Sequence, residues 1–278
     1  MIIVSDLDGT LTELGKSSVS PRTLEAAAAW KRAGHHILIA TGRSSSSLPV
    51  IVRKLSDVDT VICSNGGVVK DLRTGSSTAL GCFTSGEAEW IVKTARSLDR
   101  TVALRVETTS RLIADHGFQR GQAGSSIVEV CEDPFARLSP QDVIVKLSFH
   151  TSEQAYASLF RDVDCAVGRD RIVTPGTAGL SNFDVGPAGV DKGKGVDFVS
   201  RLLGFSASDC VALGDMPNDF PMLAWAGQAF CLGEHARDAP AGIRMAPSAA
   251  EEGWALTVES LLQSMQGRFD QRSQRSER

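Results

Sequence analysis

The 278-residue sequence has no excess of positive charge, because 29 Lys and Arg residues are outnumbered by 33 Asp and Glu residues, giving a net charge of -4. Proteins that bind nucleic acid usually present a basic field to the phosphate backbone. A nucleic-acid partner is therefore disfavoured. A small anionic substrate stays possible, because a local site can be positive in an acidic protein.

Long apolar runs are also lacking. The N-terminal run at residues 1–5 is ended by Asp6, far short of the ~20 residues that a transmembrane helix needs. No basic leader precedes this run. The six cysteines form no CxxC pair and lie mostly in apolar runs, which is typical of buried, reduced thiols. These features predict a cytoplasmic protein with no membrane partner.

Two further motifs are missing. The histidines show neither HxH nor HxxxH spacing, so no transition-metal site is expected. A dinucleotide-binding dehydrogenase needs GxGxxG after its first strand, where this chain has Asp-Leu-Asp-Gly-Thr.

The sequence does contain an alternation of predicted strands and helices. Apolar runs at 1–5, 37–40 and 60–63 fit strands that are covered on both faces of a parallel sheet. Each run ends in polar residues. Because ligands of open α/β sheets bind beyond the carboxyl ends of the strands, these polar residues are expected to meet at one site. The segments concerned are Asp6-Leu7-Asp8, Thr41-Gly42-Arg43 and Ser64-Asn65-Gly66-Gly67.

The alternation is interrupted in the middle of the chain and resumes after residue 190. Between these parts, helix signals at 84–98 and 152–160 mix with β-like runs at 101–106, 143–149 and 163–167. We predict a split core at 1–82 and 187–266, with helices that include 21–33 and 46–55. An α+β domain is inserted at 83–186. A disordered tail is expected at 267–278, where apolar periodicity is lost.

Two carboxylates stand two residues apart in Asp6-Leu7-Asp8-Gly9-Thr10, directly after the first predicted strand. One carboxylate of such a pair can attack phosphorus as a nucleophile. The other can donate a proton to the leaving oxygen and later accept one from water. Taken by itself, the pattern also fits a turn or an ordinary calcium or magnesium loop.

Four motifs in order resemble those of the haloacid dehalogenase (HAD) superfamily of phosphatases. The first, DxDGT, is matched by residues 6–10, and the second, a Thr or Ser at a strand end, is matched by Thr41. The third is Lys192, and the fourth is the acidic pair Asp215 and Asp219. Alone, these residues fit a strand-end turn, a solvated lysine or a helix cap. The ordered set favours the family.

The wording of motifs two to four is similar to the Cof-type subgroup, class IIB of the superfamily. This resemblance implies an α/β fold with a Rossmann-like parallel-sheet core and an inserted α+β cap of the C2 type. The separation of Arg43 from Lys192 leaves room for that insertion.

The resemblance also implies roles for single residues in Mg²⁺-dependent phosphoryl transfer. Asp6 would be the nucleophile and Asp8 the general acid and base. Mg²⁺ would be bound by Asp6, the backbone carbonyl of Asp8, and Asp215. Asp219 would support Lys192 or a metal-bound water. Phosphate would be bound by Thr41, Gly42, Arg43, Lys192 and Asn218, although Arg43 could instead pair with an acidic neighbour, and Gly66 and Gly67 are expected only to turn the chain.

The implied substrate is a small phosphorylated metabolite, either a sugar phosphate or a phosphorylated cofactor, with the cap selecting its leaving group. Arg105, Arg111, His116 and Lys146 are chemically suitable cap contacts, but surface solvation suits each of them as well. Two alternatives stay open: a phosphosugar mutase of the same superfamily and a non-catalytic metabolite-binding relative. The sequence does not distinguish a monomer from a homodimer.

Overall fold

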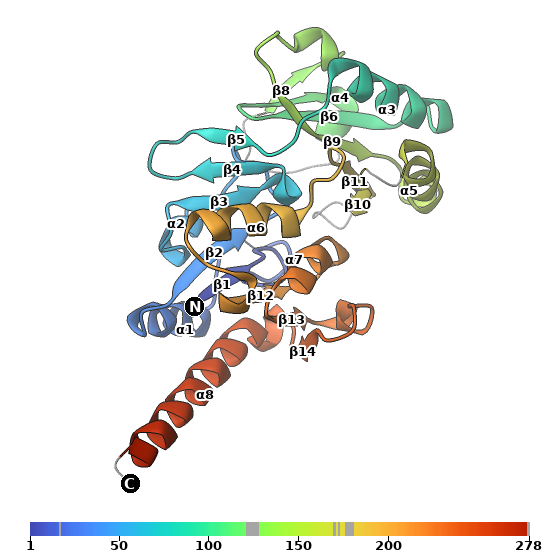
Figure 1. Ribbon diagram of the computed structural model, residues 1–278. Helices are drawn as coiled ribbons and strands as arrows, with labels where there is room; N and C mark the ends of the chain where they lie inside the picture. The colour runs from blue at the N-terminus through green and yellow to red at the C-terminus, as the bar shows by residue number, and fades with distance from the viewer. Residues whose placement is uncertain (17, 121–127, 169–170, 172, 176–180, 277–278) are drawn as a thin grey trace. The chain divides into compact units, whose positions relative to one another are not determined.

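The computed structural model describes residues 1–16, 18–120, 128–168, 171, 173–175 and 181–276 (Figure 1). Internal contacts divide the chain into two units. The first comprises Met1–Ile39, Val50–Val58 and Phe205–Arg278, and the second comprises Ala40–Pro49 and Asp59–Gly204. The second unit thus groups residues 59–82 and 187–204 with the predicted cap. The predicted division into core and cap stays a prediction.

The first unit is built on a parallel sheet with the strand order β14-β13-β12-β1-β2. Strand β1 pairs in parallel with both β12 and β2, and all four of its residues are buried. Its β-branched residues without alternation suit this position, which is covered on both faces. The strands are β1 (Ile2–Ser5), β2 (His36–Ala40, whose last residue belongs to the second unit), β12 (Cys210–Gly214), β13 (Gln228–Leu232) and β14 (Arg244–Ala246).

The described residues of this unit form four α-helices: α1 (Pro21–Arg32), α2 (Val52–Leu55), α7 (Phe220–Trp225) and α8 (Gly253–Ser276). Helix α1 begins as predicted, because the Ser20 side chain accepts a hydrogen bond from the Thr23 N–H and Pro21 occupies the first turn. Helices α1 and α8 pack against each other (Figure 1). No helix in the described ranges is long and apolar enough to cross a membrane.

Two expectations for helices differ from the structure. The helix expected at 46–55 is confined to Val52–Leu55, and the serine-rich segment before it forms turns, because serine side chains compete for backbone hydrogen bonds. Residues 267–276, expected to be disordered, continue α8. Gln and Arg in this segment have high helix propensity and no proline interrupts it.

The second unit contains an antiparallel arrangement of β3 (Thr60–Cys63), β4 (Val68–Asp71) and β5 (Ser77–Ala79). It also contains a six-stranded sheet with the order β10-β11-β9-β6-β7-β8. The strands of this sheet are β6 (Ala103–Thr108), β7 (Leu112–Asp115), β8 (Val128–Cys131), β9 (Ile144–His150), β10 (Val173–Pro175) and β11 (Asn182–Val185).

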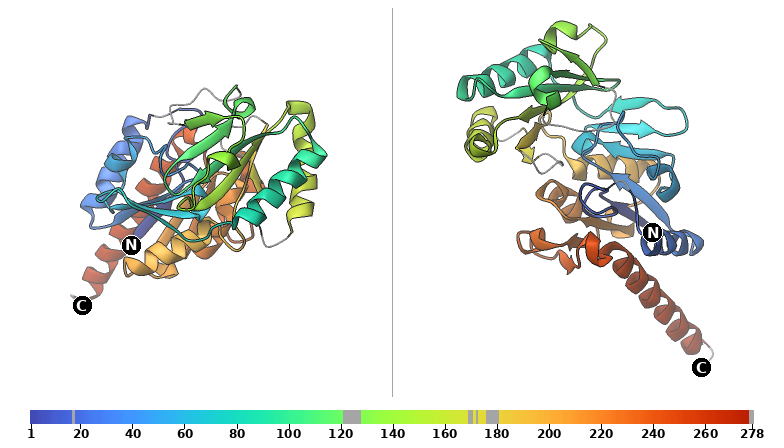
Figure 2. Two further views of the ribbon diagram at one scale, coloured as in Figure 1. Left: turned by 90° about the horizontal axis from the view of Figure 1, so that it is seen from above. Right: turned by 180° about the vertical axis from the view of Figure 1, so that it is seen from behind.

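Helices α3 (Ser85–Leu98) and α5 (Glu153–Val167) lie side by side on one face of the six-stranded sheet (Figure 2). Alternate apolar residues of β6, β9 and β11, among them Val106, Leu147 and Phe183, form a buried core with these helices. This is the α+β arrangement predicted for the insertion. The unit also includes α4 (His116–Arg120) and α6 (Lys192–Leu202).

The prediction of a β-like run at 163–167 is wrong, because these residues form the C-terminal end of α5. Val163 and Val167 are both buried in the core of the second unit. Their spacing of four residues places them on one face of a helix. The helical period therefore outweighs the strand preference of valine.

Candidate active site

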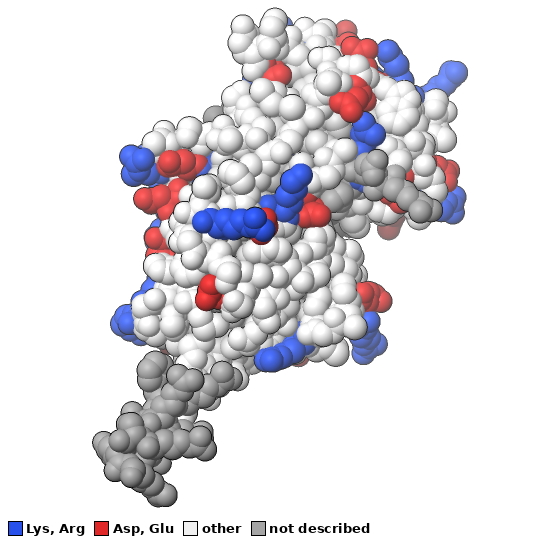
Figure 3. Space-filling view, viewed as in Figure 1, with Lys and Arg blue, Asp and Glu red and all other residues white. Residues whose placement is uncertain are grey.

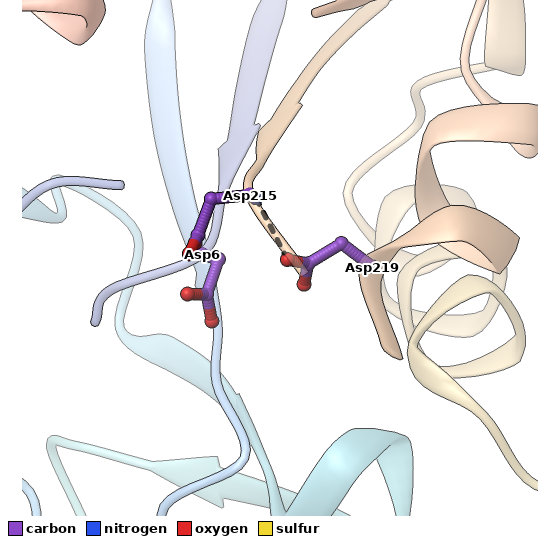
Figure 4. Close-up of side chains that lie close together, drawn as sticks. All are labelled: Asp6, Asp215 and Asp219. Atoms are coloured by element: carbon purple, nitrogen blue, oxygen red, sulfur yellow. Dashed lines mark hydrogen bonds between the residues drawn. The ribbon is translucent and has the colours of Figure 1, made fainter. Parts of the chain in front are cut away.

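Three carboxylates converge in the first unit: Asp6, Asp215 and Asp219 each place an oxygen within 4.8 Å of the others (Figure 4). Asp6 directly follows β1, and Asp215 directly follows β12. These strands are parallel neighbours with Ser5 opposite Leu213, and the N–H of Asp6 donates to the Leu213 carbonyl at 2.9 Å. The two carboxylates meet because adjacent parallel strands end at the same edge.

Asp219 holds the backbone of the loop that carries Asp215. It is fully buried, and its Oδ2 accepts hydrogen bonds from the N–H groups of Asp215 and Met216, each at 3.0 Å. A Cβ at Gly214 would lie 2.5 Å from the Cβ of Asp219. Only glycine at position 214 therefore leaves room for this buried carboxylate.

The DxDGT segment forms a tight turn against Asp215. Thr10 Oγ1 donates to Asp215 Oδ1 at 2.7 Å, and the N–H of Gly9 donates to the Thr12 carbonyl at 2.7 Å. Gly9 has a φ of +88°, a left-handed conformation that favours glycine. Asp8 is 8% exposed, and its backbone forms an isolated β-bridge with Thr12. Among the described residues, its carboxylate is not part of the three-carboxylate cluster.

A buried hydrogen-bond chain fixes the backbone carbonyl of Asp6. Ser5 Oγ donates to that carbonyl at 2.8 Å and accepts from Trp254 Nε1 at 3.0 Å. The sequence suggests only a packing role for Trp254. Its hydrogen bond joins residues 249 positions apart, and no local pattern reveals such a contact.

The carboxylate cluster has the chemistry of a site for a hard divalent cation. Three carboxylates at this separation repel one another unless a cation or a proton balances their charge. Asp6 and Asp219 are 5% and 0% exposed, so water screens them little. Carboxylate oxygens are the ligands that Mg²⁺ prefers. The donor set therefore fits Mg²⁺.

The thiol of Cys231 is affected by the charge of this cluster. Burial raises the pKa of Cys231 to about 12, and the negative charges of Asp219 and Asp215 add to this effect. A hard cation such as Mg²⁺ takes oxygen ligands and not sulfur.

The predicted phosphate-binding residues Thr41, Gly42 and Arg43 belong to the second unit. Thr41 is completely buried, and its N–H donates to the Ile62 carbonyl at 2.8 Å. Its Oγ1 accepts from the Arg43 N–H at 3.1 Å. The segment is thus a defined turn with the threonine hydroxyl inside it.

Lys192 also belongs to the second unit, as the first residue of α6. It is 1% exposed, which excludes the interpretation as a solvated lysine at a helix start. Asp191 caps the helix, since its side chain accepts from the Lys194 N–H at 2.7 Å. Asn218, in contrast, lies in the first unit, half-buried in the same short turn as Asp219.

A left-handed turn follows β3, where Ser64, Asn65 and Gly66 have φ values of 55°, 55° and 95°. The Ser64 N–H donates to the Arg43 carbonyl at 2.9 Å, and the Asn65 N–H donates to the Thr41 carbonyl at 3.2 Å. A Cβ at Gly66 would lie 1.9 Å from the Asp191 carbonyl oxygen. The turn role predicted for Gly66 is confirmed, and the turn contacts both the 41–43 loop and the start of α6.

The suggested cap contacts are placed in different environments. The guanidinium of Arg111 is held by Asp142 and Glu129 at 2.6 and 2.8 Å, and Arg105 lies over the ring of Phe118. His116 is exposed. Lys146 is only 2% exposed, so surface solvation does not describe it.

Residues 3–241 match the family model of the haloacid dehalogenase-like hydrolases. The chain belongs to this family. The match spans the four motifs and the insertion between the second and third. It confirms the predicted membership of the HAD superfamily.

Curated relatives agree with this assignment. The chain is 28% identical over 248 residues to a phosphoglycolate phosphatase of Natronomonas pharaonis. This alignment covers 84% of this chain and 86% of that protein. It is 26% identical over 235 residues to the putative phosphatase YkrA of Bacillus subtilis, with coverages of 84% and 86%.

Solved structures show the same fold. A haloacid dehalogenase-like hydrolase from B. subtilis has a TM-score of 0.76 at 19% identity, covering 93% of this chain and 98% of that one. The subclass IIB sugar phosphatase BT4131 has a TM-score of 0.75 at 18% identity, with coverages of 94% and 98%.

Proposed function

We propose that this protein is a Mg²⁺-dependent phosphatase that hydrolyses a small phosphorylated metabolite through an aspartyl phosphate at Asp6. One observation carries the proposal. The DxDGT segment places Asp6 directly after β1, where its carboxylate lies within 4.8 Å of those of Asp215 and Asp219.

Asp6 and Asp8 perform the two half-reactions. Asp6 attacks the phosphorus, the bond to the leaving oxygen breaks, and Asp8 gives its proton to that oxygen. Asp8 then accepts a proton from water as the water oxygen attacks the phosphorus of the aspartyl phosphate. This step releases inorganic phosphate and restores the Asp6 carboxylate and the protonated Asp8.

Asp6, Asp215 and the Asp8 backbone carbonyl would hold Mg²⁺. When bound, the ion offsets the repulsion between a carboxylate nucleophile and an anionic phosphoryl group. Asp219 keeps Asp215 in place through its two backbone hydrogen bonds.

The motif order supports phosphate binding by Thr41, Gly42 and Arg43, with the Thr41 hydroxyl as a donor. Lys192, a buried cation, would stabilise the negative charge of the transferring group, and Asn218 would add a hydrogen bond. In phosphoryl transfer, such positioning and charge stabilisation supply most of the catalysis.

The substrate class is supported by the names of the relatives, which include a phosphoglycolate phosphatase and a sugar phosphatase. We propose a sugar phosphate or a phosphorylated cofactor, met in the cytoplasm. The charge pattern agrees with a small substrate. The net charge is -4, and acidic and basic side chains are interspersed on the face shown in Figure 3.

The test is phosphate release from a panel of sugar phosphates, phosphorylated carboxylic acids, nucleotides and phosphorylated cofactors, with Mg²⁺ or with EDTA. We expect release that needs Mg²⁺ and no bisphosphate activator, and that falls at least about 10³-fold in Asp6→Asn. The control is Asp162→Asn, which changes an exposed carboxylate on α5. The proposal would be refuted if no compound of the panel released phosphate, or if Asp6→Asn left phosphate release unchanged.

A further inference from the structure

The six-stranded sheet of the second unit has a charged face that is buried. Glu107, Lys146 and Asp184 lie on the side opposite α3 and α5, since they alternate with core residues along β6, β9 and β11. Glu107 and Lys146 are direct cross-strand partners. The three residues are only 1%, 2% and 6% exposed. Buried charges persist only when they are paired and hydrogen-bonded.

Lys146 Nζ lies among three oxygens of the same unit. It is 3.2 Å from Glu107 Oε2, 3.2 Å from Asp184 Oδ2 and 2.8 Å from the Gly42 carbonyl oxygen. Lys146 thus forms ion pairs with two buried carboxylates and donates a hydrogen bond to the Gly42 carbonyl. Burial lowers the pKa of Lys146, but the attraction of Asp184 and Glu107 outweighs it and raises the pKa above its ordinary value. The group is therefore charged at neutral pH.

The contact with Gly42 completes a set of hydrogen bonds that fixes the whole 41–43 loop. The Thr41 carbonyl accepts from the Asn65 N–H, and the Arg43 carbonyl accepts from the Ser64 N–H. Lys146 supplies the donor for the carbonyl between them, and it is the only one of the three donors that is a side chain. Ser64 joins the same network, because its hydroxyl donates to Glu107.

Fixing one carbonyl also fixes the next N–H, because a peptide unit is planar. The Gly42 carbonyl shares its peptide with the N–H of Arg43, which donates to Thr41 Oγ1 at 3.1 Å. That bond occupies an acceptor site of the threonine oxygen and leaves its hydrogen as a donor. Without Lys146, Gly42 has the backbone freedom of a glycine and the peptide can rotate.

We infer that Lys146 is a positioning residue for phosphate binding: through the Gly42 carbonyl it holds the Arg43 N–H and the Thr41 hydroxyl in place. The inference rests on the proposed function of the 41–43 loop. It gives the inserted domain a role in ordering the phosphate-binding loop, in addition to selecting the leaving group.

Three variants separate positioning from a purely structural role. Lys146→Met removes the charge and the donor at similar length. Lys146→Met/Asp184→Asn leaves one buried carboxylate without its cation instead of two, so it perturbs the fold less than the single variant and gives a second, independent test. Asp184→Asn alone keeps the bond from Lys146 to Gly42. Lys93→Met, at an exposed ion pair on α3, is the remote control.

The measurements are the dissociation constant of inorganic phosphate by calorimetry, kcat and KM for para-nitrophenyl phosphate, and the midpoint of thermal unfolding. We expect the double variant to stay folded at the assay temperature, although it melts below the wild type because Glu107 loses its cation. It should bind phosphate about 10- to 100-fold more weakly, as misplaced contacts would give. Asp184→Asn and Lys93→Met should bind phosphate within about 3-fold of the wild type.

Wild-type phosphate affinity in the double variant would overturn the inference, and so would an equal loss in Asp184→Asn. These outcomes differ from failure of the proposed function, which would appear as absent ester hydrolysis by the wild type. A wild type that hydrolyses the ester but binds no phosphate would overturn the inference alone.

Discussion

The Cα of Gly9 lies against the carboxylate of Asp215, so that a Cβ at position 9 would be 2.2 Å from Asp215 Oδ2. Two features of the structure therefore require glycine at position 9 of the DxDGT segment. Gly9 adopts a positive φ, and it lets the chain that leaves β1 approach the carboxylate that follows β12.

Gly9→Ala should separate these two features when it is compared with Gly15→Ala. Gly15 has a similar φ of +76°, but a Cβ there would meet nothing within 4 Å. Both variants should lose about 1–2 kcal/mol of unfolding free energy from backbone strain. Only Gly9→Ala should also lose at least about 10-fold in kcat/KM, because it displaces Asp215. Urea titration measures the stability of each variant, and activity is compared under conditions where both are fully folded. Equal kcat/KM values for the two variants would contradict this interpretation.

Asp215→Asn keeps the shape of the side chain and removes its charge. If Asp215 is a ligand of Mg²⁺, the Mg²⁺ concentration for half-maximal activity should rise about 10- to 100-fold. The measurement is a Mg²⁺ titration of phosphate release after EDTA treatment, in the wild type and in the variant. An unchanged midpoint would take Asp215 out of the metal site.

Trp254→Phe removes the donor to Ser5 and keeps most of the aromatic packing. Ser5 Oγ then lacks its partner from α8, which should cost about 1 kcal/mol of unfolding free energy. Trp90→Phe is a suitable control because Trp90 is 45% exposed, and its effect should stay within about 0.5 kcal/mol. Urea unfolding of both variants measures the difference. If they lose the same stability, the hydrogen bond to Ser5 contributes nothing measurable.

Asp142 gives the second unit a defined acid sensitivity. Hydrogen bonds from Arg111, with others from Ser139, lower the pKa of Asp142 to about 2. The native state therefore binds fewer protons here than the unfolded state, whose carboxyl has a pKa of about 3.9. The stabilisation is present above about pH 4 and is lost as the pH falls toward about 2.

Asp142→Asn should consequently unfold at lower urea concentration than the wild type at pH 7. The difference between the two proteins should shrink as the pH falls from about 4 to 2. The comparison cancels the other carboxylates, which titrate in both proteins. A difference that stays constant over this window would show that the charge of Asp142 is not the source of its stabilisation.

The fold was predictable wherever local signals agreed. Ser20 and Pro21 mark the start of α1, Thr84 and Glu87 form the capping box at the start of α3, and the β-branched run at 1–5 is a buried central strand. Prediction failed where composition and period disagreed, as at Val163 and Val167 in α5. It failed also at 267–276, where a helix continues without an apolar stripe.

The site was predictable where motif residues follow paired strands, as Asp6 and Asp215 do. The network around Lys146 was not, because its members come from five segments that are separate in the sequence and meet only when β6, β9 and β11 form one sheet. Lys146 itself looks like any lysine in an alternating strand. Only the burial of its sheet face distinguishes it from a solvated residue.

The most direct test of the central claim is to trap the covalent intermediate. The wild type, mixed with its best substrate and Mg²⁺, is quenched in acid and reduced with borohydride, which converts an aspartyl phosphate to homoserine, and the peptide containing residues 1–16 is analysed by mass spectrometry. We predict homoserine at position 6 that depends on both substrate and Mg²⁺. Conversion at Asp8 or at another carboxylate, with Asp6 unmodified during turnover, would contradict the claim.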